Sequence, residues 1–292
     1  MLWFTEYYEG EGMELSGTGL TIRVKSSFRK KTPYQELLLL ETEDWGKVLV
    51  LDGAIQTTER DEFIYHEMIV HPALFTFNRP VEGVLVIGGG DGGTVREVLK
   101  HRPKEVIMVE IDREVVETAL RELPSISGGL KDERVELLFE DGREFVRDRN
   151  GEFDLIIVDC SDPVGPSKVL YREEFYRDCF KALTEDGIFV TQSESPFAQN
   201  RVHRQVVREL SKVFPIVRPY LAFIPTYPSG MWSFTIASKK LDPLGVPPTA
   251  LGRLYRELVE REGELKYFNP EVHYGAFAIP NFVYREEQDG NT

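Results

Sequence analysis

Cysteine is scarce in this sequence, long apolar runs are missing, and basic residues do not outnumber acidic ones. The two cysteines, Cys160 and Cys179, fit neither a disulfide framework nor the spacing of metal ligands. The longest apolar runs, such as residues 84–87, are strand-sized and far too short to cross a bilayer. The first six residues contain neither a basic segment nor a long apolar one, so no secretory signal is visible. These absences argue against a secreted disulfide scaffold or a helical membrane protein and predict a cytoplasmic protein without a metal site.

The balance of charge is acidic. Among 292 residues, 49 are Asp or Glu and 35 are Lys or Arg, which gives a formal net charge of −14. Such a surface repels nucleic acid and anionic membranes and favours the approach of cations. Solubility alone would also account for the excess of acid. The charge is therefore consistent with a small cationic substrate, and it predicts neither nucleic acid nor a membrane as partner.

A small N-terminal domain of β-strands is predicted for residues 1–60. Apolar and polar residues alternate over 20–28, and the apolar run 48–51 leads into Asp52-Gly53, a dipeptide typical of hairpin turns. Between 61 and 75 the apolar residues recur at helical spacing behind acidic residues. We expect this helix to begin a second domain.

The second domain, residues 61–292, is predicted to be Rossmann-like with a C-terminal extension. Strands that are apolar throughout alternate with helices, and such strands indicate a mostly parallel sheet covered on both faces. The predicted strands are 84–87, 106–109, 135–139, 155–158 and 188–191, and the predicted helices include 94–100, 113–120, 173–183 and 251–261. The expected fold class is therefore α/β with a small N-terminal all-β domain.

A glycine-rich turn directly follows the first of these strands. Residues 88–93 read Gly-Gly-Gly-Asp-Gly-Gly, so Gly88 and Gly90 begin the pattern of a nucleotide-binding turn between a strand and a helix. Glu110 ends the next strand about 20 residues on, the usual distance for a carboxylate that binds both ribose hydroxyls. NAD and S-adenosyl compounds both place a ribose there. Asp91 favours the second, because its charge would repel a pyrophosphate and attract the amine of a sulfonium compound.

Further acidic residues follow the later strands. Asp141-Gly142 closes the third strand, where a carboxylate can accept the adenine amino group and where a plain turn is equally expected. After the fourth strand, a loop stiffened by two prolines carries Asp159 and Asp162, beyond the strand end at which ligands bind in such sheets. This pair suits a cationic amine. It suits a divalent metal less well, because no nearby His or third acid completes a ligand set.

An aspartate in this place has a chemical use. A primary amine with a pKa near 10 is almost fully protonated at neutral pH, and freeing its lone pair costs about 4 kcal/mol. Asp159 can accept that proton while the amine attacks a carbon of the sulfonium compound. The residues thus predict an enzyme that uses an adenosyl-sulfonium co-substrate and no prosthetic group. The simpler alternative to this catalytic role is that Asp159 only caps the end of its strand.

Taken together, these motifs resemble those of the polyamine aminopropyltransferases, and most closely the spermidine synthases among them. The resemblance lies in the glycine turn GGGDGG, the strand end VEID and the loop D-x-S-D-P-x-G-P. It extends to LVLDGAIQTTERDEFIYHEM in the N-terminal region, to PTYPSGMWSF and to the C-terminal KYFNPEVHYGAFAIPNF. The similarity therefore covers nearly the whole chain.

This resemblance implies transfer of an aminopropyl group from decarboxylated S-adenosylmethionine to putrescine, with release of spermidine and 5′-methylthioadenosine, by a homodimer or homotetramer. Agmatine, cadaverine or spermidine as acceptor, and N-methylation of a diamine with S-adenosylmethionine, are the alternatives. Asp91 and Asp162 favour the decarboxylated co-substrate, because they would repel the carboxylate of the intact one. A dehydrogenase would need an acid–base residue for hydride transfer, and this sequence has no candidate for it at a comparable position. A non-catalytic polyamine-binding protein would need neither the glycine turn nor a proton acceptor.

The resemblance also implies roles for individual residues. Asp159 would be the proton acceptor, assisted by Asp162 and Tyr65. The positions expected to hold the co-substrate, with Gly88 and Gly90 of the glycine turn, are Gln35, Asp91, Glu110, Asp141, Gly142 and Pro166. Those expected to contact the amine are Trp3, His66, Asp91, Asp159, Cys160, Ser161, Asp162, Gln192 and Tyr227.

Several of these residues have simpler explanations. His66 could lie on a helix surface, Tyr65 and Tyr227 could be ordinary core tyrosines, and Gln35 could face solvent. Cys160 departs from the family, which commonly has serine after the catalytic aspartate. Because both residues are small, we expect little effect on the chemistry, although an exposed thiol would make the site sensitive to thiol reagents.

Overall fold

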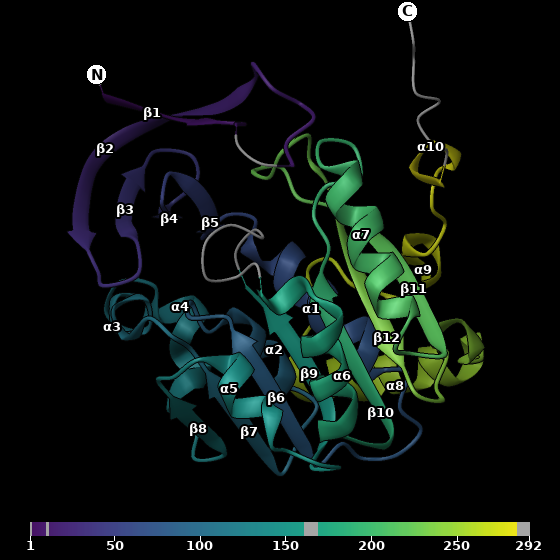
Figure 1. The fold of residues 1–292 in the computed structure, drawn as a ribbon. Helices are drawn as coiled ribbons and strands as arrows, with labels where there is room; N and C mark the ends of the chain where they lie inside the picture. The colour runs from purple at the N-terminus through teal and green to yellow at the C-terminus, as the bar shows by residue number, and fades with distance from the viewer. Residues whose placement is uncertain (1, 10–11, 161–168, 285–292) are drawn as a thin grey trace, which may run out of the picture.

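A computed structural model describes residues 2–9, 12–160 and 169–284, which form two sheets flanked by helices (Figure 1). The predicted site residues Ser161, Asp162 and Pro166 lie outside the described residues. Within the described ranges, no helix is long and apolar enough to cross a membrane.

The N-terminal sheet is entirely antiparallel, and its strands lie in chain order (Figure 1). They are β1 (Leu2–Tyr7), β2 (Gly19–Lys31), β3 (Glu36–Thr42), β4 (Lys47–Leu51) and β5 (Ala54–Thr58). The predicted hairpin turn joins β4 to β5, and both of its residues, Asp52 and Gly53, have positive φ. The all-β character predicted for this part is confirmed. β1 was not predicted, although its sequence LWFTEY is rich in strand-forming residues.

The second sheet has seven strands in the order β11-β12-β10-β9-β6-β7-β8. The strands are β6 (Gly83–Gly88), β7 (Glu105–Val109), β8 (Val135–Leu138), β9 (Phe153–Asp159), β10 (Leu183–Gln192), β11 (Ile216–Phe223) and β12 (Met231–Ser238). β6 to β10 pair in parallel, as predicted from their apolar runs. β12 pairs antiparallel with β10 and with β11. This antiparallel edge was not predicted, and it makes the sheet mixed but mostly parallel.

Helices cover both faces of this sheet because alternate strand residues point to opposite sides. Val84 and Val86 pack with α1 and α2, whereas Leu85 and Ile87 pack with α5, α6 and α7. The helices are α1 (Glu62–Leu74), α2 (Gly93–Leu99), α3 (Arg113–Glu122), α4 (Pro124–Ser127), α5 (Gly142–Arg147), α6 (Glu173–Ala182), α7 (Asn200–Ser211), α8 (Pro248–Glu262), α9 (Pro270–Ala276) and α10 (Asn281–Tyr284).

The strand order creates a crevice between β6 and β9. From β6 the chain continues to β7 and β8 on one side, and β10 lies beyond β9 on the other, so the order reverses between these two neighbours. Ligands bind at such a reversal, outside the carboxyl ends of the strands. The N-terminal sheet covers the region, since Leu37 and Leu49 pack against Val115, Leu123 and Ile126 of the α3–α4 region. The crevice is thereby closed into a cavity.

Candidate active site

A cavity of about 490 Å³ lies between the two sheets. Most of the predicted site residues line it. They are Gln35, Tyr65, His66, Gly88, Gly90, Asp91, Glu110, Asp141, Gly142, Asp159, Cys160, Gln192 and Tyr227. The carboxyl ends of β6, β7, β9 and β10 each contribute at least one of them, so the structure brings together residues that the sequence places more than 150 positions apart.

The glycine turn is needed where β6 meets β9. Gly88 pairs with Asp159 in the parallel ladder and has a φ of +82°. A Cβ on Gly88 would lie 2.1 Å from the carbonyl oxygen of Asp159, and a Cβ on Gly90 would lie 3.1 Å from Oε2 of Glu110. Only glycine accommodates both the backbone conformation and the close approach. The turn therefore leaves open the space in front of the two carboxylates.

Glu110 follows β7 at the cavity wall. Burial raises the pKa of its carboxyl to about 7, and the nearby charge of Asp112 acts in the same direction, although the Asp112 N–H lowers it. That N–H donates to Oε1 at 2.9 Å. Gln35 donates from Nε2 to Asp112 at 2.9 Å, so its side chain is tied to the protein instead of pointing to solvent. These residues form one polar wall of the cavity.

Asp141 and Gly142 begin α5 at the same wall. The carboxylate of Asp141 accepts from the N–H of Arg143 at 2.9 Å and caps the helix. A Cβ on Gly142 would lie 2.3 Å from the Ile87 side chain, so this position tolerates no side chain. Asp141 thus acts both as a helix cap and as part of the cavity wall.

Asp159 ends β9 with both carboxylate oxygens hydrogen bonded. Tyr65 donates to Oδ1 at 2.7 Å, and Thr94, which was not predicted, donates to Oδ2 at 2.6 Å. Burial raises the pKa of the carboxyl, as does the charge of Asp91, whereas His66 and the two hydroxyls lower it. The carboxyl group is therefore held in one orientation at the cavity wall, with its basicity increased.

Tyr65 belongs both to the core and to the site. Its ring is 7% exposed and packs edge-on against Tyr227 and Phe234. Burial, with the charge of Asp159, raises the pKa of its hydroxyl well above 10. The hydroxyl therefore stays protonated and donates to Asp159 throughout the neutral range.

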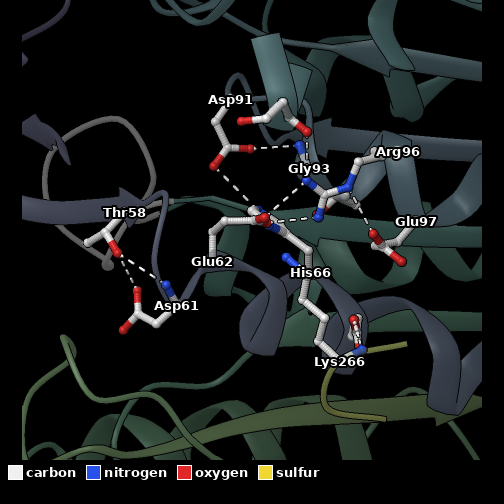
Figure 2. A network of polar contacts seen from close by, with 12 residues as sticks. Thr58, Asp61, Glu62, His66, Asp91, Gly93, Arg96, Glu97 and Lys266 are labelled. Atoms are coloured by element: carbon white, nitrogen blue, oxygen red, sulfur yellow. Dashed lines mark hydrogen bonds and ion pairs between the residues drawn. The ribbon is translucent and has the colours of Figure 1, made fainter. Parts of the chain in front are cut away.

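His66 is 2% exposed and so does not lie on a helix surface. Its Nδ1 is 2.6 Å from Oε2 of Glu62, and its Nε2 is 3.3 Å from Oδ2 of Asp91 (Figure 2). Burial lowers the pKa of the imidazole, but Asp91 and Glu62 outweigh it and raise the pKa to about 10. Glu62 was not predicted from the sequence, because its first-turn position on α1 is also where acidic residues stabilise any helix.

Another part of the cavity lining combines residues from three regions of the chain. Tyr227, in the loop between β11 and β12, donates to the carbonyl of Gln56 at 2.6 Å, and its ring centroid is 4.7 Å from that of Trp232. Gln192 donates to Oε1 of Glu194 at 2.9 Å. Other residues that line the cavity but were not predicted include Glu6, Glu9, Met13, Gln56 and Trp232. Of these, Trp232 lies in the PTYPSGMWSF motif and could have been found there.

The role predicted for Trp3 stays a prediction. Its indole is 51% exposed, lies 5.5 Å from the Arg23 guanidinium, and is not among the described residues that line the cavity. β1 reaches the cavity only from Thr5 onward. Thr5 to Glu9 and Met13 form this part of the cavity wall.

Two family models match this chain. Residues 62–244 match the spermine/spermidine synthase domain, and residues 2–59 match the spermidine synthase tetramerisation domain. The first covers the seven-stranded sheet and the second covers the N-terminal sheet.

Curated proteins match over almost the full length. The polyamine aminopropyltransferase of Caldicellulosiruptor bescii is 48% identical over 284 residues, which cover 97% of this chain and 96% of that protein. The polyamine aminopropyltransferase of Methanocaldococcus jannaschii is 46% identical over 286 residues, which cover 97% of this chain and 94% of that protein.

Solved structures agree with these matches. The crystal structure of a spermidine synthase in complex with the transition state analogue AdoDATO has a TM-score of 0.90 at 43% identity, and the spermidine synthase from Thermotoga maritima has a TM-score of 0.88 at 43% identity. Each comparison covers 97% of this chain and 93% of the other. With this identity along the whole chain, the protein belongs to the polyamine aminopropyltransferase family and is an enzyme of that family.

Proposed function

We propose that the enzyme transfers the aminopropyl group of decarboxylated S-adenosylmethionine to putrescine, giving spermidine and 5′-methylthioadenosine, with Asp159 as proton acceptor. The observation that carries this proposal is the Asp159 carboxylate, which lines the cavity and is oriented by Tyr65 and Thr94. Burial raises its pKa, which makes it a better base than an exposed aspartate.

The proposed step is a direct displacement. The amine nitrogen of putrescine forms a bond to the aminopropyl carbon next to the sulfur, and the carbon–sulfur bond breaks. The electron pair of that bond stays on sulfur, so the sulfonium becomes the neutral thioether of 5′-methylthioadenosine. The proton of the attacking amine passes to Asp159. Because positive charge is lost at sulfur, positioning and proton removal supply most of the rate.

The co-substrate would lie across the ends of β6, β7 and β8. Glu110 would accept the ribose hydroxyls, and Asp141 would accept the adenine amino group. Asp91 would receive the ammonium of the aminopropyl arm. An intact S-adenosylmethionine would instead bring a carboxylate toward Asp91 and Asp159, and like charges at this distance disfavour it. The predicted preference for the decarboxylated compound rests on this difference.

The acceptor would occupy the end of the cavity bounded by Tyr227, Gln192 and Trp232. Glu6 is 8% exposed and lines the same cavity, so this part of the cavity wall includes a carboxylate of the charge that suits the second ammonium of a diamine. This favours putrescine over a monoamine. Cadaverine, agmatine and spermidine have the same cationic character with different lengths, and they remain the alternative acceptors.

We also propose that residues 1–60 form a separate domain that assembles the chain into a homodimer or homotetramer. The match of residues 2–59 to a tetramerisation domain supports assembly of this chain with copies of itself. Light scattering coupled to size exclusion will give the mass of the assembly. A monomer at micromolar concentration would contradict this part of the proposal.

The activity is tested with purified protein, two co-substrates and a panel of amines. Decarboxylated S-adenosylmethionine or S-adenosylmethionine is mixed with putrescine, cadaverine, agmatine or spermidine. Release of 5′-methylthioadenosine and the mass of the product are followed.

We expect spermidine from putrescine and the decarboxylated co-substrate, with the highest kcat/KM of the panel. A higher kcat/KM for another amine would replace putrescine as acceptor. Methylated products from S-adenosylmethionine, without turnover of the decarboxylated compound, would overturn the proposed reaction.

A further inference from the structure

A continuous chain of buried polar contacts runs from the cavity into the space between α1 and α2 (Figure 2). It passes from Asp91 to His66 and then to Glu62, which in turn binds Arg96. The side chain of Glu62 is 7% exposed, and that of His66 is 3% exposed. Charged groups taken this far from water are stable only when they are paired and hydrogen bonded. The groups in this series of contacts, from Asp91 to Arg96, therefore have a defined charge state.

Both ring nitrogens of His66 face carboxylate oxygens. Nδ1 lies 2.6 Å from Glu62 and Nε2 lies 3.3 Å from Asp91. A neutral imidazole has a single N–H and can donate to only one of these groups, which would leave a lone pair facing the other carboxylate. The imidazolium donates to Glu62 and forms an ion pair with Asp91. The geometry therefore selects the charged ring.

Glu62 is itself fixed from the far side. Arg96 donates to its two carboxylate oxygens at 3.1 and 2.8 Å, so the carboxylate is held by a bidentate contact. Gly93 secures the ring of His66, because a Cβ on that glycine would lie 2.2 Å from Cε1 of the imidazole. The backbone N–H of Gly93 also donates to Asp91 at 2.9 Å. The imidazole of His66 and the carboxylate of Asp91 thus both contact Gly93 of the glycine turn.

We propose that Glu62 is a positioning residue for the aminopropyl end of the co-substrate, which it orients through His66 and Asp91. Glu62 keeps His66 as an imidazolium that is ion-paired through Nε2 with Asp91, and this ion pair holds the Asp91 carboxylate in place at the cavity wall. The inference rests on the proposed function, in which Asp91 receives the ammonium of the aminopropyl arm. Glu62 itself does not line the cavity among the described residues.

The charged groups around His66 come from all the elements packed against it. Glu62 and the Tyr65 hydroxyl lie on its own helix, Asp91 lies on the glycine turn, Arg96 lies on α2, and Asp159 lies at the end of β9. Removal of Glu62 would leave the Arg96 guanidinium near the imidazolium without a carboxylate between them. His66 would then lose its proton at a lower pH.

The test begins with the titration of His66, which requires no substrate. The protein has five histidines, so the ring signals of a ¹³Cε1-histidine-labelled sample are few, and the His66→Gln variant assigns the one of interest. In the wild type we expect His66 to remain protonated from pH 6 to pH 8, because its pKa is raised to about 10. In Glu62→Gln we expect the pKa to fall by about two units.

Glu67→Gln is the matched control. Glu67 is also a buried carboxylate on α1, but it accepts from the backbone N–H groups of residues 266–268 at 2.8 Å instead of from His66. This variant should lose stability without changing the His66 titration. If Glu62→Gln does not fold, Glu62→Asp retains the charge with a shorter reach, and it should lower the His66 pKa by a smaller amount.

The kinetic readout separates positioning from a structural role. In Glu62→Gln we expect KM for the decarboxylated co-substrate to rise about tenfold, the effect of one charge-assisted hydrogen bond, with a smaller change in kcat. The double variant with His66→Gln should be no worse than His66→Gln alone, because Glu62 acts through His66.

Two results would overturn the inference. One is a wild-type His66 that titrates near its ordinary pKa, and the other is a Glu62→Gln variant whose His66 titration is unchanged. Because the titration is measured on the protein alone, it stands even if the substrate panel gives a different reaction. Absence of aminopropyl transfer with a protonated His66 would overturn the proposed function and leave the Glu62–His66 coupling in place.

Discussion

The two sheets contribute to the same cavity in different ways. The seven-stranded sheet provides residues at strand ends, such as Gly88, Glu110 and Asp159, which converge because parallel strands end at one edge. The N-terminal sheet provides a wall made of side chains along β1 and around the β4–β5 hairpin. The first arrangement is fixed by topology, and the second depends on how one sheet docks on the other. The expected consequence is that chemistry resides in the parallel sheet and acceptor choice resides in the wall.

The largest effect is expected from Asp159→Asn. The amide keeps the shape of the side chain but cannot accept the amine proton, so kcat should fall about 10³-fold while co-substrate binding changes little. Steady-state kinetics and calorimetric binding measure the two effects separately. Normal turnover in this variant would remove the chemistry from the parallel sheet and break the comparison.

A pair of glycine variants compares the two sheets in stability. Gly88 and Gly53 both have positive φ, but a Cβ on Gly88 would lie 2.1 Å from a backbone oxygen, whereas nothing lies within 4 Å of a Cβ on Gly53. Gly88→Ala should therefore cost about 3 kcal/mol or more, and Gly53→Ala should cost about 1 kcal/mol. Thermal unfolding of both variants measures the difference. Equal shifts in Tm would show that backbone strain, not the close approach of β6 to β9, dominates at Gly88.

The pH dependence of the parallel-sheet site can be shifted by one hydroxyl. Proton acceptance requires ionised Asp159, whose pKa burial raises, so the acidic limb of kcat/KM should lie above the ordinary aspartate range. The hydrogen bond from Thr94 lowers that pKa. Thr94→Val removes this bond and should therefore move the acidic limb upward.

Profiles of kcat/KM from pH 5 to pH 9 measure this shift. Tyr65→Phe is the companion variant, because its hydroxyl bonds the other oxygen of Asp159 and also lowers the pKa. A limb that stays in place in both variants would mean that a group other than Asp159 controls it.

The smallest effect is expected where the β11–β12 loop meets the wall. Tyr227→Phe removes the hydrogen bond to the Gln56 carbonyl that joins the β11–β12 loop to the N-terminal sheet. Loss of one such bond is worth about 1 kcal/mol, so KM for the acceptor should rise about fivefold with kcat and co-substrate KM nearly unchanged. Kinetics with putrescine varied at saturating co-substrate measure this. A loss of kcat as large as that of Asp159→Asn would contradict the division between the two sheets.

Local signals in the sequence were sufficient for much of the fold. The apolar runs of β6 to β10 and the helical spacing of α1 were readable because each depends only on neighbours in the chain. β11 and β12 were missed, although both are rich in aromatic and β-branched residues. Their antiparallel pairing at the sheet edge depends on contacts with β10, which no local pattern reports.

The residues of the candidate site likewise divide into those that the sequence indicated and those that it did not. Gly88, Glu110 and Asp159 could be predicted because the end of a parallel strand specifies where its next residue must lie. The position of β1 along the cavity, and so whether Trp3 reaches the site, is set by the register of β1 with β2 and by the docking of the sheet. Thr94 and Glu62 carried no signal, since their contacts join residues 65 and 34 positions apart, to Asp159 and Arg96.

The sequence alone therefore determined the strand-turn-helix order, the glycine turn and the acid at each strand end, because these follow from backbone conformation and from the direction of the chain. The tertiary structure decided which side chains complete the site. It alone placed the wall residue Glu6 at the cavity and His66 between two carboxylates. The physical reason is that burial and hydrogen-bond pairing depend on segments far apart in the chain, which come together only when the two sheets and α1 pack.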